Sequence, residues 1–225
     1  SGGRMVLGVG AGWNARESAM FGYPFGTASA RAVRLDEALT VMRGLLRAEA
    51  PCTFAGSTIG VQDAVLTDAG IPGNMPILVG GRGPKLTLPI VARHADIWGA
   101  QMVTPEEFAE RNAMLDRLIV EEGREPASVR RAVMFGVLCG DDDQIAEQVR
   151  RVPILPADMS IAERRDFFTE RFRWAVGTPD VVRARIDAYV AAGADEFIVQ
   201  WFNWFGIETS EQIEHEVRLL ESLAA

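Results

Sequence analysis

Apolar runs alternate along the whole chain with stretches in which apolar residues recur at every third or fourth position. The runs predict buried strands, and the recurring stretches predict amphipathic helices. Strands are predicted at Met5–Gly10, Pro76–Val79, Ala95–Ala100, Val129–Cys139 and Phe197–Gln200. Each strand continues into a helix, which is typical of repeated β/α units and therefore of a parallel sheet or barrel. No linker rich in Pro, Gly or Ser divides the units, so we expect one α/β domain over residues 1–225.

Capping residues mark where several helices begin. Thr104 and Glu107 form a capping box around Pro105 at the first helical position, and this helix is expected to end at Gly123. The same kind of signal is found at Asp141–Asp143, at Thr178-Pro179-Asp180 with Gly193 as the end, and at Thr209 with Gln212. One more helix is predicted by the spacing of Leu35, Ala38, Leu39, Met42 and Leu46.

Two segments depart from the β/α alternation. Cys52–Leu66 carries β-favouring residues on both sides of Ala55-Gly56-Ser57, which predicts a hairpin that turns there. Ser160–Trp174 shows no regular period and is expected to be less regular. We therefore expect one hairpin between the first two parallel strands.

Composition narrows the class of protein. The chain is 48% hydrophobic and 24% charged, as in a soluble globular domain, and its net charge of −8 disfavours a nucleic-acid partner. No apolar run is long enough to cross a membrane and no signal peptide is recognisable, so a cytoplasmic protein without membrane attachment is expected. Two distant cysteines and two histidines support neither a disulfide framework nor a metal site, and no metal is predicted.

Candidate chemistry is expected at the carboxyl ends of the strands, where parallel β/α proteins bind ligands. Glycines gather there, in Gly10-Ala11-Gly12-Trp13-Asn14, Gly80-Gly81-Arg82-Gly83, Gly99-Ala100-Gln101 and Gly140-Asp141, whereas the last strand ends in Gln200-Trp201. Backbone N–H groups after the second strand could hold an anion at the start of the following helix, and Arg82 or Lys85 could add charge. A tight turn from strand to helix would require the same glycines.

Other functional patterns fail on particular residues. Trp13 stands where a dinucleotide-binding fingerprint demands glycine, and no Walker A loop or nucleophile elbow occurs. His94 is expected to cap a helix and His215 to be solvated. The aromatic residues after the last strand could line a pocket or simply pack together, namely Trp201, Phe202, Trp204 and Phe205.

Several of these motifs together resemble one family, the luciferase-like monooxygenases, and within it the coenzyme F-420-dependent oxidoreductases. The resemblance is carried by motifs in a fixed order, namely Ser1–Arg4 before Leu7–Asn14, Phe21-Gly22, Arg34–Leu46, Pro76–Gly81, Ala92–Trp98, Gly177–Pro179 and Ala192–Asp195. It implies a TIM (β/α)8 barrel of the bacterial luciferase-like type.

The resemblance also implies a coenzyme site. The turn that holds the coenzyme phosphate corresponds to Val79, Gly80, Gly81, Arg82 and Gly83, and the turn near the ring and ribityl chain corresponds to Ala11, Gly12, Trp13 and Asn14. The implied reaction is hydride transfer between C5 of coenzyme F-420 and a small organic substrate, with FMN and a monooxygenase reaction as the alternative. No catalytic residue is assigned, and the assembly could be a homodimer.

The first strand of this chain resembles the fourth strand of the family's barrel. We therefore expect strands four to eight here, with the family's first three β/α units missing. A barrel fragment that only binds or supports structure is accordingly a third functional alternative.

Overall fold

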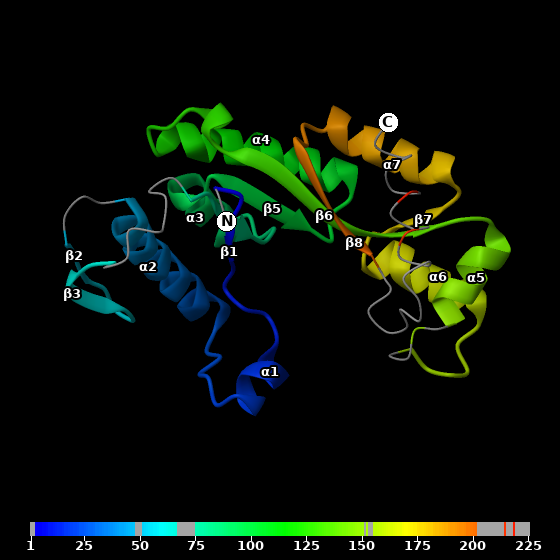
Figure 1. Cartoon of the computed structure of the whole chain (residues 1–225), viewed down its shortest axis with the longest axis horizontal. Helices are drawn as coiled ribbons and strands as arrows, with labels where there is room; N and C mark the ends of the chain where they lie inside the picture. The colour runs from blue at the N-terminus through cyan, green and yellow to red at the C-terminus, as the bar shows by residue number, and fades with distance from the viewer. Residues whose placement is uncertain are drawn as a thin grey trace. The chain divides into compact units, whose positions relative to one another are not determined.

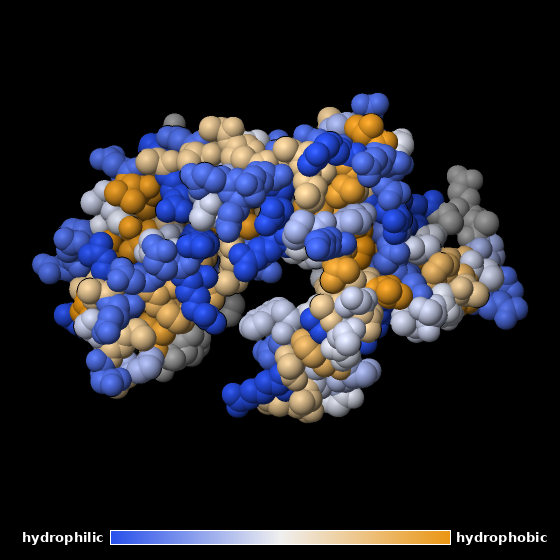
Figure 2. All heavy atoms as spheres, turned by 180° about the vertical axis from the view of Figure 1, so that it is seen from behind, coloured by the Kyte–Doolittle hydropathy of each residue, from blue (hydrophilic) through white to orange (hydrophobic). Residues whose placement is uncertain are grey.

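The computed structural model describes residues 3–47, 51–66, 75–150, 152, 155–201, 214 and 218. The chain divides into two compact units (Figure 1): unit 1 contains residues 1–99 and 111–131, and unit 2 contains residues 100–110 and 132–225. No described helix is both long and apolar enough to cross a membrane. Hydrophilic and hydrophobic residues are interspersed over the face drawn in Figure 2.

The sheet of unit 1 is parallel, as the sequence predicts. It contains β1 (Leu7–Val9), β4 (Ile77–Gly80) and the start of β5 (Ile97–Gln101), with Val9 beside Val79 and Gly80 beside Gly99. The helices are α1 (Ala15–Met20), α2 (Ala28–Arg47), α3 (Thr87–His94) and the second half of α4 (Pro105–Glu121), and a 3-10 turn covers Pro126–Ser128. Leu35 and Leu39 of α2 are buried, in agreement with the stripe predicted for this helix, and Leu88 of α3 and Leu115 of α4 are fully buried as well.

Charged residues join α2 to α3. The guanidinium of Arg93 binds both carboxylate oxygens of Asp36, at 2.8 and 3.0 Å, and Nε2 of His94 lies 2.8 Å from Asp36 Oδ1. The expectation that His94 caps a helix was therefore wrong, because its buried ring binds a carboxylate of another helix. Burial lowers the pKa of His94, and this effect outweighs the hydrogen bond to Asp36, which acts in the opposite direction.

The predicted hairpin is confirmed as β2 (Cys52–Ala55) and β3 (Gly60–Ala64), which pair antiparallel. A single carboxylate of α2 holds its turn. Glu37 accepts bonds from the amide and hydroxyl of Ser57, from the amide and hydroxyl of Thr58 and from the amide of Ile59, at 2.6 to 2.9 Å. These bonds lower the pKa of Glu37 from 4.5 to about 2.

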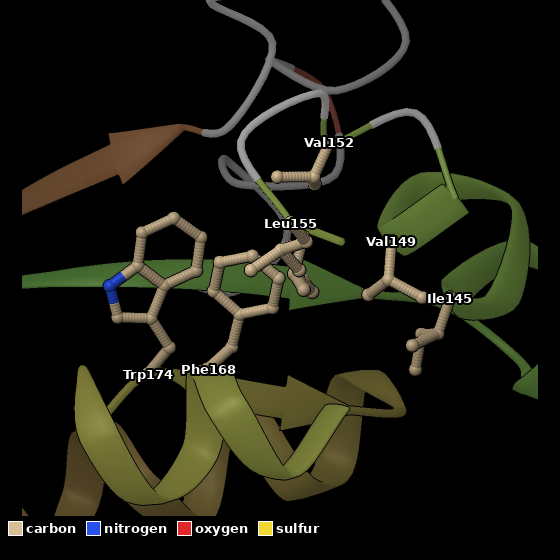
Figure 3. Packing of buried hydrophobic residues seen from close by; sticks show 7 residues of the cluster. Ile145, Val149, Val152, Leu155, Phe168 and Trp174 are labelled. Atoms are coloured by element: carbon tan, nitrogen blue, oxygen red, sulfur yellow. The ribbon is translucent and has the colours of Figure 1, made fainter. Parts of the chain in front are cut away.

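The sheet of unit 2 is built on β6 (Arg130–Cys139), whose first two residues belong to unit 1. This strand pairs in parallel with β7 (Ala175–Gly177) and with β8 (Glu196–Trp201). Unit 2 also contains the start of α4, together with α5 (Asp142–Arg150), α6 (Ile161–Asp166) and α7 (Pro179–Ala191). Figure 3 shows its core, where Phe168 and Trp174 stack with ring centroids 4.9 Å apart beside Ile145 and Val149.

The segment without a regular period contains more structure than the sequence predicts. Ser160 starts α6 with a capping box, and a π-helix, which we call the π turn, follows at Phe167–Arg171. Strand β7 comes next and was not predicted, because its three residues are too few to show a period. Gly193 follows α7 with a φ of +92°, as expected, although the side chain of Thr178 makes no capping bond. The start of the last helix, predicted at Thr209 with Gln212, lies outside the described residues.

Candidate functional site

Three glycines lie side by side near the carboxyl edge of the unit 1 sheet, although β5 continues beyond Gly99 to Gln101. Gly80 pairs with Gly99, and a Cβ built on Gly10 would lie 3.6 Å from the carbonyl oxygen of Gly80. Because side chains alternate along a strand, this glycine row shares the face of Leu78, opposite the fully buried Ile77 and Val79. At Gly10 and Gly80 the row is bare backbone that a flat ligand could approach closely, whereas the side chain of Leu78 covers Gly99, where a Cβ would lie 2.8 Å from Leu78 Cδ2.

The turn after β4 is shaped by Gly81. Its φ of +140° is a conformation that side chains rarely adopt, and a Cβ there would lie 2.8 Å from Cγ2 of Thr87. The Gly81 amide donates to the Gly99 carbonyl at 3.0 Å, and its own carbonyl accepts from Nε1 of Trp98 at 2.8 Å. This glycine is thus required by the turn itself, and its amide is not available to an anion.

The rest of this turn leads directly into α3. The Gly83 carbonyl accepts from the amides of both Thr87 and Leu88 at 3.0 Å, so those two N–H groups of the first helical turn are also occupied. Arg82 and Lys85 are exposed at the same turn. Phosphate attraction by this turn would therefore depend on these cations and on the remaining amides, not on the Gly81 amide.

The loop after β1 is held by side chains at both ends. Nε of Arg31 donates to the Gly12 carbonyl at 3.1 Å, and Oδ1 of Asn14 accepts from the Glu17 amide at 3.2 Å as the N-cap of α1. Gly12 has a φ of +77° and would find no atom within 4 Å of a Cβ. Trp13 is 82% exposed, so its indole lies on the surface of the loop rather than in the core.

The remaining predicted strand ends differ from expectation in detail. Gly99 lies inside β5, which extends to Gln101, and the left-handed residue after this strand is Met102, with a φ of +54°. In unit 2 the Gly140 amide donates to the Gly177 carbonyl at 3.1 Å, which repeats the bond between Gly81 and Gly99. Gln200 and Trp201 lie within β8, and the aromatic residues from Phe202 onward lie outside the described residues.

Ionisable chemistry is sparse around the glycine row. Among the residues that the structure describes, no group of three or more His, Cys, Asp or Glu side chains could hold a metal ion. The charged network of unit 1 instead connects the other ends of α3 and β5, where Asp96 accepts from the Ile77 amide at 2.8 Å and pairs with Arg47. The carboxyl edge therefore offers bare backbone, an exposed indole and two cations.

Known structures with this fold include enzymes of several kinds. An F-420-dependent secondary alcohol dehydrogenase in complex with an F-420–acetone adduct matches with a TM-score of 0.71 and 21% identity, over 88% of this chain and 64% of that one. The coenzyme F-420-dependent tetrahydromethanopterin reductase of Methanopyrus kandleri matches with a TM-score of 0.70 and 19% identity, over 95% of this chain and 72% of that one. The EDTA monooxygenase of Chelativorans matches with a TM-score of 0.66 and 18% identity, over 95% of this chain and 64% of that one. These likenesses show an α/β fold with the parallel sheet of the luciferase-like barrels.

Sequence comparison adds one relative and a family. An uncharacterised protein of Mycobacterium tuberculosis is 33% identical over 105 residues, which are 47% of this chain and 35% of that protein. The chain thus spans about a third of the length of this curated relative. The sequence profile of the luciferase-like monooxygenases matches residues 1–196. The chain belongs to the luciferase-like monooxygenase family.

Proposed function

We propose that this protein is an oxidoreductase that transfers a hydride between coenzyme F-420 and a small organic substrate. The observation that carries the proposal is the glycine row, because three neighbouring strands place glycines side by side on one face, and no side chain covers Gly10 and Gly80 there. Two of the similar structures are named as F-420-dependent enzymes, which supports the same coenzyme here.

The residues of the carboxyl edge fit a deazaflavin. The glycine row would lie against the flat ring, the loop from Ala11 to Asn14 would border the ring and ribityl chain, and Arg82 and Lys85 would attract the phosphate. When bound, the coenzyme supplies a carbon that accepts or releases a hydride. The chain contributes orientation of the ring and exclusion of water from one of its faces.

In this proposal the five predicted strands, which are β1, β4, β5, β6 and β8, correspond to strands four to eight of a (β/α)8 barrel, and the short β7 is additional to them. A barrel closes only when its first and last strands pair, and its coenzyme site is then completed by loops from several strands. The coenzyme contacts assigned to this chain would therefore be one part of a larger site.

A flavin monooxygenase is the second candidate. Bare backbone accommodates an isoalloxazine as well as a deazaflavin, and the similar structures include a monooxygenase and a riboflavin lyase with modified FMN. The two functions differ in their use of oxygen, because reduced flavin reacts with it in monooxygenases and a deazaflavin serves hydride transfer.

Fluorescence titration of the purified protein with coenzyme F-420 and with FMN separates the two candidates. We expect tighter binding of coenzyme F-420 and no oxygen consumption when reduced FMN is supplied. Tighter binding of FMN together with oxygen consumption would assign the protein to the monooxygenases. Absence of binding by either coenzyme would overturn both candidates for the chain as it stands and favour a structural or binding role.

A further inference from the structure

Unit 2 contains a hollow of about 580 Å³. It is lined by Ile161, Ala162, Arg165, Asp166, Thr169 and Val176, which come from α6, the π turn and β7. Ile161 and Val176 are partly buried and pack on the aromatic core with their other atoms. The hollow therefore has an apolar wall that packs against the aromatic core of unit 2.

The backbone around the hollow is unusual in two ways. The π turn interrupts the helix after Asp166, and π-helical turns are rare and frequently found at functional sites. Arg173 has a φ of +60°, a left-handed conformation that costs free energy for any residue with a side chain. The Trp174 amide donates to the Phe168 carbonyl at 3.1 Å, and the two rings stack (Figure 3), so the core holds this irregular segment in place.

The polar groups of the hollow leave one charge uncompensated. Arg165 binds the Asp142 carboxylate at 2.7 Å, and the Thr169 hydroxyl donates to the Arg165 carbonyl at 3.0 Å. Within the described part of the chain, the Asp166 carboxylate, on the same helix, takes part in no hydrogen bond or ion pair. The hollow thus combines an apolar wall with one carboxylate that has no partner among the described residues.

We propose that this hollow binds a small organic cation, with its ammonium group at Asp166 and its hydrocarbon part against Ile161 and Val176. A carboxylate attracts an ammonium group by Coulomb forces, and the apolar wall gains free energy when a hydrocarbon displaces water from it. An anion would meet the unpaired carboxylate and a guanidinium that is already paired. The site belongs to unit 2 alone and does not depend on which coenzyme the protein uses.

Three probes of equal length test the proposal by NMR titration of the full chain at pH 7: hexylammonium, hexanoate and hexanol. Hexylammonium should bind most tightly and shift the signals of Ile161, Thr169 and Val176. Asp166 is exposed, and replacing it by Asn should weaken the binding of hexylammonium by up to about fivefold, as for an exposed ion pair. The matched control is Asp158→Asn, which removes the same charge from an exposed residue outside the hollow and should leave binding unchanged.

A second variant tests the location independently of charge. Ala162 is exposed on α6, so Ala162→Trp should leave the fold intact while its indole occupies the hollow and abolishes binding of hexylammonium. Binding of hexanoate or hexanol as tight as that of hexylammonium would overturn the proposal. So would an equal loss of affinity in Asp166→Asn and Asp158→Asn, or unchanged binding in Ala162→Trp. No coenzyme is present in these titrations, so their failure would leave the proposed oxidoreductase function untouched.

Discussion

Nε of Arg31 donates a hydrogen bond to the carbonyl oxygen of Gly12 at 3.1 Å. The same guanidinium donates to the Gly26 carbonyl at 3.0 Å and lies 3.9 Å from the centroid of the Phe25 ring. One side chain of α2 therefore joins the loop after β1 to the segment that precedes the helix. Because that loop contains four of the nine proposed coenzyme contacts, Arg31 is a positioning residue for the site.

Replacing Arg31 by Ala should loosen this loop without unfolding unit 1. The variant loses two hydrogen bonds and a cation–π contact at a partly exposed site, which together contribute about 1 kcal/mol. Hydrogen exchange should accelerate at the amides of Gly12 and Trp13. Arg34→Ala is the control, since Arg34 makes a single bond to the Pro24 carbonyl at 3.2 Å. Equal exchange rates in both variants would mean that Arg31 does not hold the loop.

Local signals in the sequence were sufficient to predict most of the helices and strands. The capping box at Thr104 forms as expected, with the Thr104 amide 2.9 Å from Glu107 Oε2 and the Glu107 amide 3.2 Å from Thr104 Oγ1. Long elements repeat their pattern over several turns, so they are recognisable. Strand β7 and the π turn are short and depend on the packing of Phe168 against Trp174, which brings together residues that no local period relates.

The candidate site could be predicted only as a set of strand ends. Glycines after strands were recognisable, and the alignment of Gly10, Gly80 and Gly99 follows from the register of three strands, which a sequence does not display. What each of these residues does also depends on contacts between residues that are far apart in the sequence. The Gly81 amide is occupied by Gly99, and His94 meets Asp36, a partner 58 positions away.

The bonds from the hairpin turn to Glu37 predict a measurable effect of Glu37→Gln. An amide oxygen carries no full charge and only one side-chain acceptor remains, so the turn at Ser57 and Thr58 should detach more often from α2. Limited proteolysis should cut the hairpin faster than in the parent protein. The control is Glu121→Gln, an exposed position on α4. A cleavage rate that Glu37→Gln leaves unchanged would contradict the role of this carboxylate.

The carboxylate of Glu37 should also make the attachment of the hairpin turn to α2 depend on pH. Its pKa is lowered to about 2 in the folded protein, from an ordinary value of 4.5. A lowered pKa means that its stabilising effect is fully present above 4.5 and is lost as the pH falls towards 2. Cleavage of the hairpin by an acid-stable protease should therefore increase below pH 4.5 in the parent protein, and Glu37→Gln should show a weaker increase.

The buried ring of His94 should make the free energy of unfolding depend on pH near neutrality. Burial lowers its pKa below the ordinary 6.5, so the unfolded chain binds this proton more readily than the folded protein does. The free energy of unfolding should thus fall as the pH decreases below 6.5, in a window above pH 5 where carboxylates scarcely titrate. Urea unfolding should show this slope in the parent protein and in His215→Gln, and a smaller slope in His94→Gln. A rise in stability on acidification would mean that the ring pairs with Asp36 as a cation.

We expect Gly81→Ala to lower the free energy of unfolding by about 1–3 kcal/mol. The alanine would have to adopt the strained φ of Gly81, and its methyl group would collide with Thr87. Gly12→Ala separates the two causes, since Gly12 also has a positive φ but no atom within 4 Å of a Cβ. We expect the loss in Gly12→Ala to be smaller, about 1 kcal/mol. Denaturant unfolding measures both values. A loss in Gly81→Ala no larger than that in Gly12→Ala would show that contact with Thr87 is unimportant.

The glycine row offers a test of the coenzyme site that leaves the fold intact. A methyl group on Gly10 would lie 3.6 Å from the Gly80 carbonyl oxygen, and one on Gly80 would lie 3.7 Å from the Val9 carbonyl oxygen, both ordinary contacts. Gly10→Ala and Gly80→Ala should therefore change the free energy of unfolding by no more than about 0.5 kcal/mol. Each methyl group would nevertheless stand where the proposed ring approaches the backbone.

We expect each of these two variants to bind the coenzyme about tenfold more weakly, a loss of about 1.4 kcal/mol, in the same fluorescence titration. Gly8→Ala is the matched control. Gly8 lies in β1, two residues before Gly10 and on the same face, and its Cβ would meet no atom within 4 Å. Its affinity should equal that of the parent protein. If Gly10→Ala and Gly80→Ala also kept full affinity while remaining folded, the ring could not lie on the glycine row, and the coenzyme assignment of this edge would have to be abandoned.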